Sequence, residues 1–189
     1  MLEVYWAYKD YKDMMKLTQK MLKKWVKGKW QTKDFSKVFK EKTGKKYTDI
    51  NPAELDEYYK KEVRANIEGP IFLTHYPESI MPLAKFKEDD SSLTESFQLI
   101  INGAEVAKGF SEMNDPLAQR EQMERQEEKF RSGHKEVSRL DENFLEALEY
   151  GMPPAAGLGI GLDRLATLVG GGHSNIRDVI LFPFMRPKS

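Results

Sequence analysis

Apolar positions change their spacing along the chain, and this change divides it into predicted elements. Residues 2–8 (LEVYWAY) are mostly β-branched or aromatic and alternate between two faces, which predicts a strand with Glu3 and Tyr5 on one face and with both faces covered. From residue 10 to residue 27 apolar side chains recur every three or four positions, which predicts an amphipathic helix with lysines on its other face. Residues 28–69 are lysine-rich and weakly apolar, and we interpret them as a small helical insertion.

The pattern after residue 70 predicts a sheet and further helices. PIFLTHYP and FQLII are typical of strands, and Asn102-Gly103, a pair typical of tight hairpins, joins the second of these to AEVAKGF. Asp115 precedes a long charged helix, a shorter helix ends before Gly151, and we expect NIRDVILFPFMRP to be a mostly buried apolar segment. Hairpin strands with separate helices indicate an α+β fold, an antiparallel sheet flanked by helices in one domain, residues 1–189.

Composition narrows the possible functions. The chain has 30 Lys+Arg and 30 Asp+Glu, so a formal net charge of zero gives no overall basic field for a nucleic acid. It has no cysteine, which excludes disulfides and thiol nucleophiles and fits a reducing compartment. Its three histidines lack metal-ligand spacing. The N-terminal residues show no signal-peptide pattern and the apolar runs are short, so we expect a cytoplasmic protein with no membrane partner.

The stretch GLGIGLDRLATL is the strongest candidate for a binding site. Gly157, Gly159 and Gly161 alternate with apolar residues, which predicts a strand with one bare face. Either a ligand lies on that face or a neighbouring element packs closely against it, and the spacing alone leaves both open. The stretch lacks the spacing of a phosphate-binding glycine loop. Asp163-Arg164 follows, and a guanidinium at the end of a bare strand can hold a phosphate or stack on a base, which favours a nucleotide pocket.

Three segments resemble class II lysyl-tRNA synthetases and occur in the order of that family. GMPPAAGLGIGLDRLATLV, followed by NIRDVILFPFMRP, resembles the third signature motif, MLEVYWAYKDY resembles the strand that closes the second motif, and FSEMNDP resembles a substrate-site strand. The resemblance extends from Met1 to Pro187 and is weakest in the lysine-rich insertion. It implies part of the class II catalytic core, with ATP-dependent activation of lysine and ligation to tRNA, Mg²⁺ as a cofactor, and a homodimer in the full-length protein.

The resemblance also implies a nucleotide end of the site. Arg164 matches an arginine that stacks on the adenine near the γ-phosphate, and the three glycines leave room for ATP. Glu105 matches a carboxylate that holds magnesium. Gln98 stands where the family usually has a second glutamate, so the metal would depend on Glu105 together with phosphate oxygens and water.

A lysine pocket is implied at five further positions. Glu3, Tyr5 and Glu112 match the side-chain pocket, because a desolvated ammonium needs three acceptors and negative charge, and Phe110 would pack along the aliphatic stem. Without the resemblance, Glu3 and Glu112 are more simply strand carboxylates in structural ion pairs. Lys108 stands where many lysyl enzymes have an asparagine, and it can bind the substrate carboxylate but repels an α-ammonium.

The family comparison also raises the question of length. Complete members carry an anticodon-binding barrel, a first motif that builds the dimer and a second-motif arginine, all before the position of Met1. We therefore expect a catalytic-domain fragment that is deficient in catalysis on its own. Two other functions stay open, namely a synthetase paralogue that transfers an amino acid to a protein and a non-catalytic interaction module that retains the fold.

Overall fold

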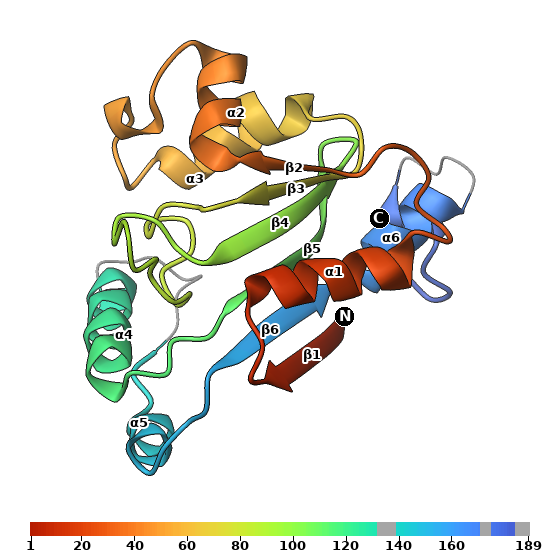
Figure 1. Ribbon diagram of the computed structural model, residues 1–189. Helices are drawn as coiled ribbons and strands as arrows, with labels where there is room; N and C mark the ends of the chain where they lie inside the picture. The colour runs from red at the N-terminus through yellow and green to blue at the C-terminus, as the bar shows by residue number, and fades with distance from the viewer. Residues whose placement is uncertain (132–138, 171–174, 184–189) are drawn as a thin grey trace, which may run out of the picture.

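One mixed sheet organises the protein (Figure 1). The structure is a computed structural model that describes residues 1–131, 139–170 and 175–183. Within these residues six strands lie in the order β1-β6-β5-β4-β3-β2. β2 and β3 are parallel, and every other neighbouring pair is antiparallel. The strands are Leu2–Ala7 (β1), Gln31–Asp34 (β2), Ile71–Thr74 (β3), Ser96–Ile101 (β4), Ala104–Ser111 (β5) and Ala155–Ile160 (β6).

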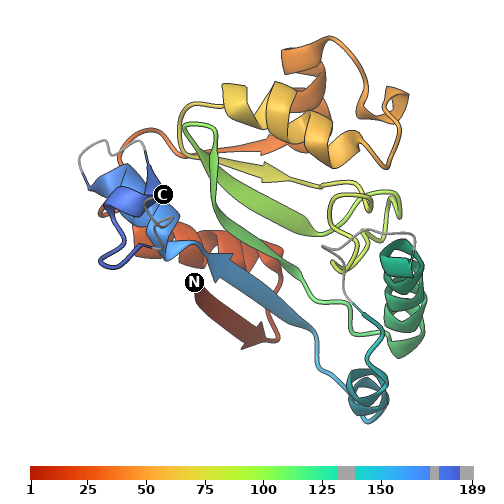
Figure 2. The same cartoon turned by 180° about the vertical axis from the view of Figure 1, so that it is seen from behind.

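Helices flank this sheet, as the sequence predicted (Figures 1 and 2). The α-helices are Tyr11–Leu22 (α1), Phe35–Thr43 (α2), Leu55–Tyr58 (α3), Pro116–Arg131 (α4), Glu142–Glu149 (α5) and Leu162–Val169 (α6). Shorter helical turns are Tyr47–Asp49 (η1), Tyr59–Val63 (η2), Arg64–Asn66 (η3) and Ile176–Asp178 (η4). The α+β fold is therefore confirmed, with the parallel β2–β3 pair as the exception to an antiparallel sheet. Across the described ranges, no helix combines the length and apolar character that crossing a membrane requires.

The lysine-rich stretch 28–69 is mostly helical, but it also adds a strand to the sheet. β2 has the sequence QTKD, in which no apolar residue marks a strand, and the sequence analysis did not predict it. β2 is a strand because its backbone pairs with that of β3, an interaction that the side-chain pattern of QTKD does not reveal. Asp34 then caps α2 by accepting a hydrogen bond from the Ser36 backbone N–H at 3.0 Å, and Gly44, with φ of 71°, ends that helix.

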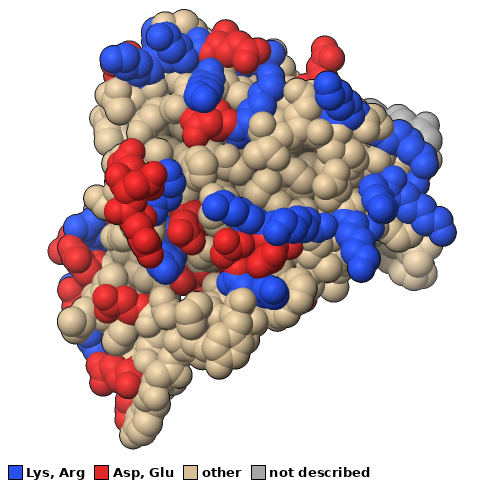
Figure 3. All heavy atoms as spheres, viewed as in Figure 1, with Lys and Arg blue, Asp and Glu red and all other residues tan. Residues whose placement is uncertain are grey.

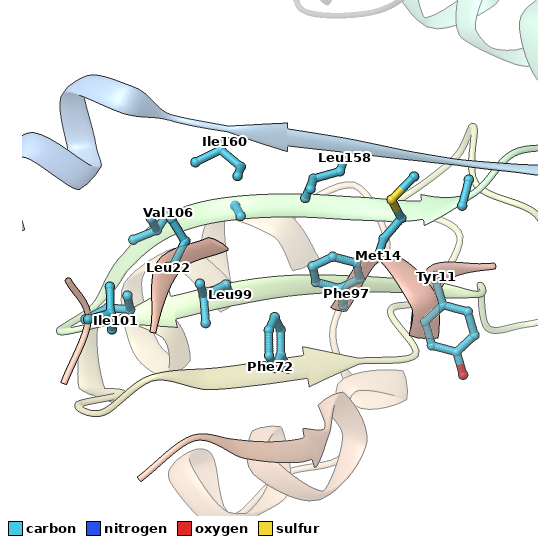
Figure 4. Packing of buried hydrophobic residues seen from close by; sticks show 13 residues of the cluster. Tyr11, Met14, Leu22, Phe72, Phe97, Leu99, Ile101, Val106, Leu158 and Ile160 are labelled. Atoms are coloured by element: carbon cyan, nitrogen blue, oxygen red, sulfur yellow. The ribbon is translucent and has the colours of Figure 1, made fainter. Parts of the chain in front are cut away.

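Two apolar clusters cover different parts of the sheet. On one face α1 packs on β4, β5 and β6 (Figure 4), through buried side chains that include Met14, Leu22, Phe97, Leu99, Leu158 and Ile160. The lysines of α1 lie on its solvent side, and in the space-filling view they cross the middle of the molecule (Figure 3). A second cluster covers β3 and β4 with α2 and η2, and it includes Phe35, Phe39, Tyr59, Leu73 and Ile100. Over β1, β6 and much of β5, the face opposite α1 carries no described helix (Figure 2).

Two segments predicted to be covered are exposed. β1 is an edge strand whose partner is β6, and Tyr5 is 73% exposed, so the prediction that both faces of this strand are covered was wrong. In the described part of the C-terminal segment, Leu181 and Phe182 are 90% and 91% exposed, so the prediction of a mostly buried segment was also wrong there. In residues 175–183 the chain forms η4 and contributes no strand to the sheet, which leaves these side chains outside both clusters.

The β4–β5 hairpin contains a bulge that matters for the site. Its turn is the predicted pair, Asn102 with φ of 49° and Gly103 with φ of 76°, and two successive positive φ angles are typical of a type I′ turn. Further along the hairpin the register shifts, because Ile100 pairs with Glu105 and the following residue, Val106, is an extra one. The bulge turns Glu105 toward the face that also carries Lys108, although an odd number of positions separates them.

Candidate functional site

A cavity of about 480 Å³ opens over β1, β6 and β5, on the face of the sheet opposite α1. Every residue that the sequence analysis assigned to ATP, lysine or metal lines this cavity: Glu3, Tyr5, Glu105, Lys108, Phe110, Glu112, Gly157, Gly159, Gly161 and Arg164. They come from three strands, from Glu112 directly after β5, and from the start of α6, so the cavity joins distant segments of the sequence. The structure therefore brings the two predicted half-sites into one cavity.

Two rows of paired residues cross the floor of the cavity. The rows are Glu3–Gly159–Lys108 and Tyr5–Gly157–Phe110. Strands rise about 3.4 Å per residue, so the rows lie about 7 Å apart along the strands. In both rows the middle position is a glycine, so side chains from β1 and β5 face each other across bare backbone.

Gly157 leaves room for a side chain of this same chain. A Cβ atom at this position would overlap Oε1 of Glu112 and would lie 3.2 Å from Cε1 of Tyr5. The Glu112 carboxylate therefore lies over the β6 backbone, close to the second row. Of the two explanations for the glycine pattern, close packing accounts for Gly157, where the packed group is the carboxylate of a predicted ligand-binding residue.

Gly159 and Gly161 are in different surroundings. The nearest atom to a Cβ at Gly159 would be Sδ of Met1 at 3.6 Å, an ordinary contact distance, so this part of the floor is open. A Cβ at Gly161 would lie 3.4 Å from the Arg164 side chain, and Gly161 is the N-cap of α6, not a residue of β6. The three glycines thus line three successive parts of the cavity. Met1 also lines the cavity, although the sequence analysis assigned it no role.

Glu112 has a carboxylate without a countercharge. Among the described residues, no hydrogen-bond donor or cation contacts its oxygens, and burial raises its pKa to about 7. The pKa of the nearby Tyr5 hydroxyl is raised by burial and then by the negative charges of Glu112 and Glu3. Glu3 likewise forms no ion pair in the part of the chain that the structure describes. The alternative of ordinary strand carboxylates in structural ion pairs therefore does not apply to these two residues.

These groups make one end of the cavity suited to a cation. Two carboxylates and a phenol supply acceptors, and a bound ammonium would provide the charge that Glu112 lacks. Phe110 supplies an apolar wall in the second row.

Lys108 places an opposite charge in the first row. Its ammonium forms no ion pair and no hydrogen bond with any described residue. It lies across Gly159 from Glu3 and between the Glu112 end of the cavity and the Arg164 end along β5. An unpaired ammonium at this place is suited to an anionic group of a ligand.

The other end of the cavity is formed where β6 passes into α6. Arg164 donates a hydrogen bond from Nη1 to the backbone oxygen of Glu105 at 2.9 Å, and the same nitrogen lies 3.5 Å from Glu105 Oε1. The Arg164 side chain is 54% exposed, which leaves its guanidinium accessible from the cavity. Gly161 donates its N–H to the Val106 oxygen at 2.9 Å and thereby fixes the start of α6 against the bulge.

A second arginine approaches Glu105 from the insertion. Nη1 of Arg64, in η3, lies 3.9 Å from Glu105 Oε2, while its Nε is buried and has no hydrogen-bond partner among the described residues. Sequence reasoning missed Arg64, because it lies in a lysine-rich stretch with no motif and more than thirty positions before the hairpin. Only the packing of η3 beside the hairpin turn reveals the contact.

No cluster of acidic and histidine side chains suited to a metal occurs within the described ranges. Of the three histidines, His75 contacts Asp34 through Nδ1 and Tyr11 through Nε2, each at 3.0 Å, on the α1 side of the molecule. His134 and His173 lie outside the described residues.

Comparison with known proteins identifies a family for the chain. The sequence profile described as tRNA synthetases class II (D, K and N) matches residues 1–186. The chain belongs to this family. The match includes all three strands that form the cavity and the start of α6.

Curated relatives are named lysine–tRNA ligase. The protein from Porphyromonas gingivalis strain W83 is 38% identical, with 99% of this chain and 39% of that protein covered. The protein from Synechococcus sp. CC9311 is 37% identical over 99% of this chain and 46% of its own length, and that from Staphylococcus saprophyticus is 35% identical over 100% and 46%. The chain thus spans less than half the length of these relatives.

Proposed function

We propose that the cavity binds lysine and ATP and that the chain acts in the ATP-dependent ligation of lysine to tRNA. The observation that carries the proposal is the Glu112 carboxylate, which lies beside Tyr5 in a partly buried cavity without a cation of its own. Membership of the class II family and the names of the relatives support the same activity. The tRNA partner, a homodimer of the full-length protein and a cytoplasmic location belong to this proposal.

Lysine fits the two rows in one orientation. Its side-chain ammonium lies at Glu112 and Tyr5, its aliphatic stem packs along Phe110, and its carboxylate meets Lys108. An extended chain covers about 3.5 Å for every three bonds, so the six bonds from carboxyl carbon to ammonium span about 7 Å, the separation of the rows. Glu3, across Gly159 from Lys108, supplies further negative charge for the ammonium groups.

ATP takes the end of the cavity at Arg164. The guanidinium offers a planar surface for adenine and paired donors for phosphate, and the open backbone at Gly159 and Gly161 leaves room for the nucleotide. A lysine carboxylate held at Lys108 then faces the nucleotide. Its oxygen attacks the α-phosphorus, pyrophosphate leaves, and the Lys108 charge reduces the repulsion between carboxylate and phosphate.

Magnesium was expected at Glu105, but the contacts in the structure do not fit a metal held by the protein there. Both carboxylate oxygens of Glu105 face guanidinium groups, and Gln98, which stands where the family usually has a second glutamate, offers no carboxylate. Mg²⁺ requires nearly ideal octahedral oxygen ligands. We therefore assign no step to a metal ion bound by these side chains.

Binding measurements on two variants test the proposal. By isothermal titration calorimetry, we expect the wild-type chain to bind both lysine and ATP. Glu112→Gln should weaken lysine binding by about ten-fold or more and retain ATP binding. Arg164→Ala should weaken ATP binding and retain lysine binding. Lysine binding without ATP binding would favour a non-catalytic module. Failure of the wild-type chain, with an unchanged circular dichroism spectrum, to bind either ligand would contradict the proposal.

A further inference from the structure

The nucleotide end of the cavity holds one carboxylate and two guanidinium groups. Oε1 of Glu105 lies 3.5 Å from Nη1 of Arg164, and Oε2 lies 3.9 Å from Nη1 of Arg64. Glu105 and Arg64 have side chains that are only 22% and 23% exposed, so solvent screens this pair less than a surface pair. The three groups carry a net positive charge, which favours an anion over a cation at this place.

The fold fixes Arg64 beside Glu105. η3 packs against the β4–β5 turn, where Gly103 donates its N–H to the Ile67 oxygen at 2.7 Å and a Cβ at Gly103 would lie 3.1 Å from the Ala65 oxygen. This contact brings the residue before Ala65 to the base of the hairpin. Arg64 does not line the cavity itself, so it acts on the cavity through Glu105.

Gln98 cannot supply the missing metal ligand. It is 5% exposed, and its Oε1 accepts hydrogen bonds from the hydroxyls of Tyr59 at 2.9 Å and Tyr76 at 3.0 Å. The two hydroxyls also lie 2.7 Å from each other. This oxygen is therefore committed to a buried network with side chains of the insertion and of the loop after β3.

We infer that Arg64 is a positioning residue that neutralises Glu105, so that the cavity binds ATP with little dependence on Mg²⁺. The inference rests on the proposed ATP site. When Arg164 moves from Glu105 to the phosphates, Arg64 stays with the carboxylate, and Glu105 needs no metal ion to balance its charge. The polyanionic phosphates then meet a free guanidinium instead of a carboxylate that requires a bridging cation.

Removal of Arg64 should create the magnesium dependence that the wild-type chain lacks. In Arg64→Met, departure of Arg164 to the nucleotide leaves Glu105 partly buried and without a countercharge. A cation is then needed between carboxylate and phosphate. Arg64→Lys keeps a positive charge, and Glu105→Gln in the Arg64→Met background removes the charge that needs balancing, so both changes should restore the wild-type behaviour.

The test is the ATP dissociation constant in excess MgCl₂ and in EDTA, measured by calorimetry on the chain and its variants. We expect the ratio of the two constants to stay below about three for wild type and Arg64→Lys, and to rise at least about five-fold in Arg64→Met, the lower end of typical couplings between sites. The double variant should return to the wild-type ratio. Arg125→Met, which removes an exposed arginine paired with Glu78 and Glu121, is the matched control and should not change the ratio.

Other outcomes contradict the inference. Wild-type binding that is lost in EDTA, or a ratio in Arg64→Met equal to the wild-type ratio, would overturn it while leaving the proposed ATP site in place. Absence of ATP binding under both conditions would contradict the proposed function as well. If Arg64→Met fails to fold, the single variant Glu105→Gln tests the inference. A metal-ligand role for Glu105 predicts weaker ATP binding only in MgCl₂. Our account predicts equal or tighter ATP binding in both MgCl₂ and EDTA.

Discussion

Glu112 carries the clearest sign of function at the scale of a single residue. A carboxylate that the fold partly buries and does not pair raises the free energy of the empty protein, because the charged form loses hydration without gaining a partner. Selection for stability alone would place an amide or an apolar residue there. The unpaired Glu112 carboxylate therefore favours a site that binds a cationic ligand.

The first prediction concerns the stability of Glu112→Gln. The raised pKa of about 7 means that the folded state binds a proton more tightly than the unfolded state, so wild-type stability falls as pH rises from about 4.5 to about 7. The amide resembles the protonated acid. We therefore expect nearly equal melting temperatures at about pH 4, below the unfolded pKa, and a more stable variant at pH 8, by on the order of 2 kcal/mol after allowance for partial exposure. A variant less stable at pH 8 would contradict a carboxylate without a partner.

The second prediction concerns Lys108 and the substrate carboxylate. Lys108→Met should weaken lysine binding by about ten- to one-hundred-fold, the value of a charge-assisted contact. Cadaverine, which lacks the carboxylate but keeps a second ammonium, should bind the variant at least as well as the wild-type chain, and Lys108→Arg should retain most of the lysine affinity. An equal loss for lysine and cadaverine in calorimetry would show that Lys108 acts on the pocket in general.

At the scale of elements, β6 and its neighbours show which features a sequence can reveal. The strand with Gly157 and Gly159 and the Asn102-Gly103 turn follow local signals and were predicted correctly, whereas Gly161, predicted to belong to the strand, is the N-cap of α6. β2 was not predicted, because its four polar residues form a strand only through pairing with β3. The bulge at Val106 also escaped prediction, since its cause is the register between two strands and not the pattern of either one.

The third prediction separates two kinds of glycine in adjacent strands. A Cβ at Gly109 would lie 2.7 Å from both the Gly157 oxygen and Cε1 of Phe97, so Gly109→Ala should destabilise the fold by about 1–3 kcal/mol. In Gly159→Ala the new Cβ meets no atom of the described residues closer than 3.6 Å, so stability should change by less than about 0.5 kcal/mol, while the methyl group weakens ligand binding by filling the floor. Chemical denaturation and calorimetry on both variants provide the check. A large loss of stability in Gly159→Ala would support close packing instead of a ligand floor.

At the scale of the whole molecule, the sheet brings together residues that the sequence keeps apart. β1, β6 and β5 are neighbours in the sheet although long stretches of sequence separate them, so the cavity was predicted from resemblance to a family and not from local pattern. The resemblance identified ten of the residues that line the cavity. It could not identify the contact of Arg64 with Glu105 or the hydrogen bond that Gln98 accepts from Tyr59. Both depend on how the insertion packs on the hairpin of this particular chain.

The most direct test of the central claim is a comparison of L-lysine with L-norleucine, which has the same aliphatic stem but no side-chain ammonium. At pH 8, where Glu112 is ionised, calorimetry should show lysine binding at least about ten-fold more tightly than norleucine, because a charge-assisted contact contributes about 1.5–3 kcal/mol. At pH 5.5 the carboxyl is protonated and the preference should shrink. Equal affinity for the two amino acids at pH 8, or a preference that does not change with pH, would contradict a lysine pocket built on Glu112.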